Sequence, residues 1–84
     1  MSIEVASNQV FQGDGSNPVI SVVVTASTGT ATVQKLAGND ESGTWVSVTD
    51  GSVANANGEL SLEAPIGQKY RITLTGDAQA YVTI

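Results

Sequence analysis

The chain has no cysteine, no histidine and only three basic residues, Lys35, Lys69 and Arg71, among its 84 residues. Without cysteine no disulfide can tie the fold together, and without cysteine or histidine a structural zinc site of the usual kind is excluded. Catalysis by a histidine-activated serine or by a thiolate nucleophile is excluded for the same reason. These absences remove much of the chemistry of metalloproteins and hydrolases.

Positive charge is also scarce. Eight acidic residues against three basic ones give a formal net charge of −5 and an isoelectric point of about 4.1. Such a chain lacks the basic patch that binds nucleic-acid phosphates, and anionic membrane surfaces repel it. The opening MSIEVASNQ has neither the basic nor the apolar region of a signal peptide. We therefore expect synthesis in the cytoplasm without export by the usual route, and no nucleic-acid or membrane partner.

Valine, isoleucine and threonine dominate what is present, and glycine and asparagine interrupt them at short intervals. This composition is typical of many short β-strands, and no window shows the period of an amphipathic helix. At 84 residues we expect one domain spanning 1–84. We predict an all-β fold, a small antiparallel β-sandwich of about seven or eight short strands. It is either immunoglobulin-like or a jelly roll, with an open barrel as the alternative.

The second half of the chain predicts a meander of consecutive hairpins. Four turns join its strands: Asp50-Gly51, Asn57-Gly58, 64–68 and 76–78. Their lengths set Leu62 opposite Tyr70 and Ile72 opposite Val82. These registers place one set of side chains on a single inward face: Val46, Val48, Val53, Leu60, Leu62, Tyr70, Ile72, Leu74, Val82 and Ile84.

The first half is less regular. Residues 1–11, which include Val5 and Phe11, have apolar content but no strong hairpin signal beside them. They are interpreted either as an edge strand of the sandwich or as an arm that pairs with a neighbour's sheet edge. The next strand pattern carries Val19 and Val23 on the face that should be wet in a two-layer fold.

Trp45 is the most conspicuous single side chain. The meander register turns Val46 inward and therefore turns Trp45 outward, where it and Tyr81 could stack on sugar rings or anchor a protein partner. Alternatively Trp45 folds over the end of the core, or a bulge after Gly43 returns it to the interior. The candidate partner-binding residues are Val5, Phe11, Val19, Val23, Trp45 and Tyr81.

The acidic residues have ordinary structural explanations. Lys69 and Arg71 fall beside Glu63 and Glu59 in the meander, which predicts exposed cross-strand ion pairs of about 0.2–1 kcal/mol each. A catalytic carboxylate pair would instead need two acids facing each other across a cleft. We therefore predict no enzymatic activity and no catalytic residue.

Calcium is the only metal that the side chains suggest. Asp14 lies in a Gly-Asp-Gly turn, and Asp40 and Glu41 are adjacent in an acidic loop. Neither run has the spacing of an EF-hand, and aspartate and glycine are common turn residues. We therefore predict no metal ligand and no cofactor.

Residues 28–84 contain TGTATVQKL, then an acidic and glycine-containing loop, TWVSVTDGS, NGELSLEAPIGQKYRITLTG and a closing AYVTI. This pattern resembles small bacteriophage virion proteins, in which such strands recur in β-sandwich modules on heads or tails. The resemblance covers about two-thirds of the chain. It implies a structural role in a virion and brings no catalytic residue with it.

The resemblance implies a non-enzymatic phage protein, above all a capsid decoration protein that binds and stabilises the assembled head. Its location would be the virion and its partner a capsid or other virion protein. Self-association, with a trimer as the favoured state, is also expected. Two alternatives remain: a carbohydrate-binding module that uses Trp45 and Tyr81, and a spacer protein of the tail or baseplate.

Overall fold

The computed structural model describes residues 2–13, 15, 18–38, 43–65 and 67–83. These residues form eight strands: β1 (Ser2–Val5), β2 (Val10–Gln12), β3 (Val19–Thr25), β4 (Thr30–Ala37), β5 (Thr44–Ala54), β6 (Gly58–Glu63), β7 (Lys69–Thr75) and β8 (Gln79–Thr83). Across the described ranges there is no helix, and hence none that could cross a bilayer. The predicted all-β sandwich of seven or eight strands is confirmed.

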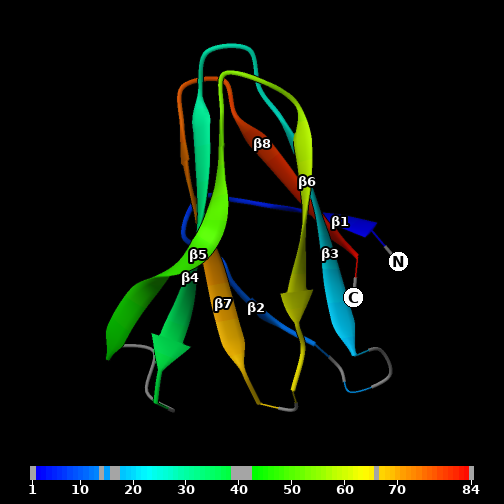
Figure 1. Ribbon diagram of the computed structural model, residues 1–84, viewed down its shortest axis with the longest axis vertical. Helices are drawn as coiled ribbons and strands as arrows, with labels where there is room; N and C mark the ends of the chain where they lie inside the picture. The colour runs from blue at the N-terminus through cyan, green and yellow to red at the C-terminus, as the bar shows by residue number, and fades with distance from the viewer. Residues whose placement is uncertain (1, 14, 16–17, 39–42, 66, 84) are drawn as a thin grey trace.

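The strands form two antiparallel sheets that pack face to face (Figure 1). Sheet A has the order β1-β8-β3-β6, and sheet B has the order β2-β7-β4-β5. Four nested pairs generate this order, because β1 pairs with β8, β2 with β7, β3 with β6 and β4 with β5. The chain is thus one long hairpin, folded back between β4 and β5 and then rolled into two layers. This topology is the jelly roll, rather than the immunoglobulin-like arrangement.

The predicted hairpin meander of the second half is wrong. Successive strands from β5 to β8 alternate between the two sheets, so none of them pairs with the next along the chain. Leu62 pairs with Ile20, whereas Tyr70 pairs with Phe11 and Lys35 in the other sheet. An alternating pattern buries one face of a strand whether its neighbour in sequence lies beside it or across the core. The alternation therefore does not determine which strands pair.

The expected turn at Asp50-Gly51 is a bulge inside β5. Thr32 pairs with Ser52 and Gln34 with Ser47, so four residues of β5 lie opposite a single residue of β4. Asp50 adopts a positive φ of 58°, the same left-handed conformation that favours this dipeptide in hairpin turns. Gly51 does not have a positive φ, so the two residues do not form the type I′ turn that the dipeptide predicts, and the segment is a bulge instead.

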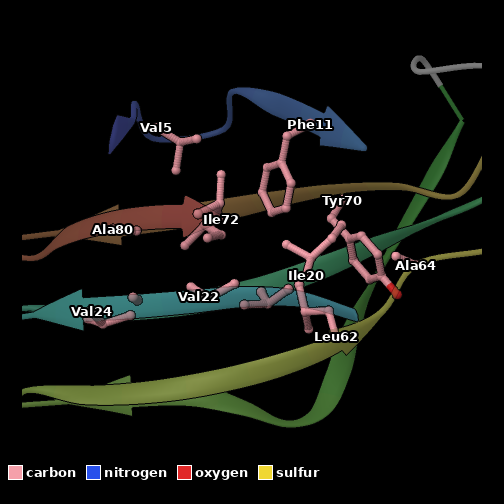
Figure 2. Close-up of a cluster of buried hydrophobic side chains, with 13 residues drawn as sticks. Val5, Phe11, Ile20, Val22, Val24, Leu62, Ala64, Tyr70, Ile72 and Ala80 are labelled. Atoms are coloured by element: carbon pink, nitrogen blue, oxygen red, sulfur yellow. The ribbon is translucent and has the colours of Figure 1, made fainter. Parts of the chain in front are cut away.

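One core lies between the sheets (Figure 2). Its buried members are Val5, Phe11, Ile20, Val22, Val24, Ala31, Val33, Leu62, Ala64, Tyr70, Ile72, Ala80 and Val82. The Phe11 and Tyr70 rings stack with their centroids 6.1 Å apart. The Tyr70 hydroxyl donates a 2.6 Å hydrogen bond to the backbone oxygen of Glu63, which ties β7 to the end of β6. Burial, and secondarily the Glu63 carboxylate, raises the pKa of the Tyr70 phenol.

The predicted inward face is mostly right despite the wrong pairing. Eight of its ten members are buried in the core or packed against it: Val48, Val53, Leu60, Leu62, Tyr70, Ile72, Leu74 and Val82. Val46 is wrong, because its side chain is 52% exposed. It lies at the start of β5, which swings away from sheet A in Figure 1. Ile84 lies outside the described residues.

The N-terminal residues belong to the sandwich. β1 is one of the two edge strands of sheet A and β2 is one of the two edge strands of sheet B, so the chain crosses from one layer to the other between them. Val5 and Phe11 are only 1% and 6% exposed. Of the two interpretations of this segment, the structure has the edge strands and not a free arm.

One carboxylate joins two turns at the end of the sandwich. Asp77, in the turn between β7 and β8, accepts hydrogen bonds from the backbone N–H groups of Ser27, Thr28 and Gly29 at 2.8 to 3.2 Å. These residues form the turn between β3 and β4. A side chain on Gly29 would put its Cβ 2.2 Å from the backbone oxygen of Thr75, so this close approach requires glycine.

Candidate interaction surfaces

The outer face of sheet A is an ordered set of cross-strand rows. In one row Glu4, Tyr81, Val23 and Glu59 lie side by side on β1, β8, β3 and β6. The next row along the strands contains only hydroxyl side chains: Ser2, Thr83, Ser21 and Ser61. A third row pairs Val19 with Glu63. The face thus has an apolar centre, carboxylates at its borders and a line of hydroxyls across it.

The apolar part of this face is accessible. Val19 and Val23 are 46% and 43% exposed, while Tyr81 is half-buried and its hydroxyl lies 3.3 Å from Gln79 Oε1. Scattered apolar side chains are normal on protein surfaces, but here Val23 and Tyr81 are direct cross-strand neighbours. The prediction that Val19 and Val23 lie on an outward face of their strand is confirmed.

Charge divides between the two sheets. Every charged residue in the strands of sheet A is a glutamate: Glu4, Glu59 and Glu63. All three cations of the chain lie in strands of sheet B, where Asp50 is the only acidic strand residue. The strands of sheet A therefore carry three negative charges, and those of sheet B carry a net charge of three minus one, or +2. The predicted ion pairs of Glu59 and Glu63 with Lys69 and Arg71 are wrong, because the partners lie in different sheets.

The outer face of sheet B is closed by its own side chains. The guanidinium carbon of Arg71 lies 4.5 Å from the centre of the Trp45 ring system, and Arg71 Nε donates a 2.7 Å hydrogen bond to Gln34 Oε1. Leu36, the cross-strand partner of Trp45, is only 3% exposed although it lies outside the core between the sheets. Trp45 is thus the cross-strand neighbour of a buried leucine, and its ring lies beside the Arg71 cation.

Of the positions that the sequence left open for Trp45, the structure has the outward one, with the indole half-buried in this cluster. Leu36 was not predicted to belong to such a cluster. A signal was present, because Leu36 is out of phase with Ala31 and Val33 on the same strand, which turns it to the opposite face. An apolar residue that breaks the alternation opposite a tryptophan indicates a small second core.

The six candidate residues do not form one surface. Val5 and Phe11 are buried in the core, so an exposed role for them is wrong. Val19, Val23 and Tyr81 share the outer face of sheet A, whereas Trp45 lies on the outer face of sheet B. Trp45 and Tyr81 therefore face opposite sides of the molecule and cannot stack on the same sugar.

No cavity is found in the part of the chain that the structure describes, and no three acidic side chains gather there in a way that could hold a metal. Asp14, Asp40 and Glu41, which the sequence suggests for calcium, lie outside the described residues. The candidate interaction surfaces among the described residues are therefore the two outer sheet faces.

Comparison with known protein families, with curated proteins and with solved structures finds no match for this chain.

Proposed function

We propose that this protein is a non-enzymatic structural protein of a bacteriophage virion, and specifically a decoration subunit that binds the assembled head. The resemblance of residues 28–84 to small virion proteins supports this proposal. The jelly roll is an architecture that viral capsid domains use, although lectins and cupins use it as well. Because one fold serves many functions, a functional assignment requires a binding surface and not the fold alone.

The observation that carries the proposal is the outer face of sheet A. It holds two exposed valines, Val19 and Val23, and Val23 lies next to Tyr81 across neighbouring strands of the four-stranded sheet. Burial of apolar area against another protein contributes about 25 cal/mol for each Å² removed from water. A subunit that binds only the assembled shell stabilises the shell by mass action.

The geometry favours this function over sugar binding. A sugar-binding module of the predicted kind needs Trp45 and Tyr81 on one platform, and the structure puts them on opposite faces. Arg71 already lies against the Trp45 ring. A protein lattice requires no such platform, because repeated shallow contacts supply the binding energy.

The test is binding to virus particles. Particles purified from lysates of the source cells on a density gradient are expected to carry the chain in a fixed ratio to the main shell protein. Stripped particles should take up the purified chain to the same saturating ratio. Light scattering of the free chain measures its mass in solution and so tells whether the chain is a trimer before it binds. Absence of the chain from the particles, together with no uptake by stripped particles, would refute the proposed function.

A further inference from the structure

We infer that the outer face of sheet A is a docking surface whose partner is a protein surface that presents lysine or arginine on both sides of an apolar side chain. The row of Glu4, Tyr81, Val23 and Glu59 is the basis of this inference. It places two neighbouring apolar residues between two exposed glutamates. The inference rests on the proposed function only for the partner's location in a virion.

The spacing of the row defines what fits on it. Neighbouring strands lie about 4.8 Å apart, so the two glutamates at the ends of a four-strand row are about 14 Å apart. A partner with two cations at that separation and an apolar residue between them would satisfy the whole row. Backbone or amide groups of the partner would then face the adjacent hydroxyl row, where Ser2, Thr83, Ser21 and Ser61 can donate or accept hydrogen bonds.

Charge selects a basic partner over a second copy of this face. Two copies that met through their sheet A faces would bring Glu4, Glu59 and Glu63 of each copy into one interface. The strands of sheet A would supply no cation from either copy. Like charges placed together across an interface disfavour that pairing. A basic surface is attracted to the same three carboxylates, and attraction of this kind accelerates association and determines orientation.

The apolar part of the surface is tested with a matched pair of variants. Val23→Ser changes an exposed valine on sheet A, and Val46→Ser changes an exposed valine on sheet B. On stripped particles we expect Val23→Ser to weaken binding about five- to tenfold, because it removes buried apolar area from the interface. Val46→Ser should bind like the wild type. Equal binding by all three chains overturns the inference and leaves the proposed function intact.

The charged part is tested with two variants that change net charge equally. Glu59→Gln with Glu63→Gln removes two negative charges from sheet A, and Thr49→Lys with Ser52→Lys adds two positive charges to exposed positions of β5 in sheet B. At low salt the first pair should weaken binding several-fold and the second should not. The difference should shrink at about 1 M salt, where the screening length is only about 3 Å. Equal weakening by both pairs overturns the inference.

A second probe separates the two proposals. If the wild-type chain does not bind particles, the proposed function fails, and a soluble lysine–phenylalanine copolymer then decides the chemistry of the face. The copolymer should bind the wild type more tightly than polylysine does, and Val23→Ser should remove that preference while Val46→Ser keeps it. No preference overturns the inference. A concentration-dependent dimer of the wild type that Val23→Ser abolishes also overturns it, because a second copy would then be the occupant.

Discussion

The two sheets contribute to one core but differ on their outer faces. On sheet B, Trp45, Arg71, Gln34 and Leu36 contact or shield one another within the molecule. On sheet A, Val23 and Tyr81 lie between glutamates, and Val23 keeps 43% of its surface in contact with water. The conspicuous tryptophan is therefore used in folding, while an ordinary valine is left accessible. A side chain's prominence in the sequence is thus a poor guide to its availability for a partner.

The largest expected effect is on the core, to which both sheets contribute. Ile20 of sheet A and Ile72 of sheet B are 1% and 0% exposed. Each Ile→Ala variant should lower the free energy of unfolding by about 2–5 kcal/mol, because each leaves a cavity in the same core. Urea unfolding, monitored by circular dichroism, measures the free energy of unfolding of each variant. A much smaller loss for one variant would show that the sheets do not contribute equally.

A smaller effect should separate the outer faces. Leu36→Ala on sheet B is expected to cost about 2–3 kcal/mol, because a shielded leucine is truncated. Val23→Ser on sheet A should change stability by no more than about 0.5 kcal/mol, as surface substitutions usually do. The same unfolding measurement applies to both. If Val23→Ser were the more damaging variant, the outer face of sheet A would be structural and the contrast would fail.

The sequence predicts which side chains face inward but not which strands pair. The alternation in Lys69–Thr75 and Gln79–Thr83 identified which side chains point inward, because that depends only on the period of a strand. Pairing was not predictable in the same way. Nested pairs join residues as distant as Ile3 and Val82, and no local turn signal encodes such contacts. Asp50-Gly51 shows the difficulty, since a dipeptide typical of hairpin turns forms a bulge within β5 here.

The candidate surface was predictable only in part. That Val19 and Val23 face outward followed from the alternation of β3. Their neighbours depended on the pairing, so Glu59 was assigned to Arg71 when its strand partner is Val23. The division of charge between the sheets became visible only once the strand order was known. It explains why glutamates that looked like ion-pair partners instead border an apolar face.

Acid should weaken the end of the sandwich where Asp77 joins the two turns. Hydrogen bonds from Gly29, Ser27 and Thr28 lower the pKa of Asp77. A carboxyl whose pKa is lower in the folded state stabilises the fold above the pKa of the unfolded chain, and this contribution is lost as pH falls through the folded pKa. We expect the melting temperature to fall below about pH 4, the ordinary pKa range of aspartate.

Asp77→Asn should reduce this part of the acid dependence and lower stability at neutral pH. Asp50→Asn is the control, because it removes a carboxylate from β5 that makes none of these three backbone contacts. Thermal melts between pH 2 and 7 compare the variants. An acid profile that is identical in Asp77→Asn and wild type would show that the junction between the turns does not depend on the charge.

The smallest expected effect concerns the closure of the sheet B face. Arg71→Met keeps much of the length of the side chain but removes its charge, its place over Trp45 and its bond to Gln34. We expect a loss of about 0.5–1 kcal/mol, the range of a cation–π contact at an exposed site. Trp45 is the only tryptophan, so its emission reports the change directly. Lys35→Met removes another cation from the same sheet and should leave the emission unchanged. A shift of equal size in both variants would mean that the emission follows net charge, and that Arg71 does not close the face.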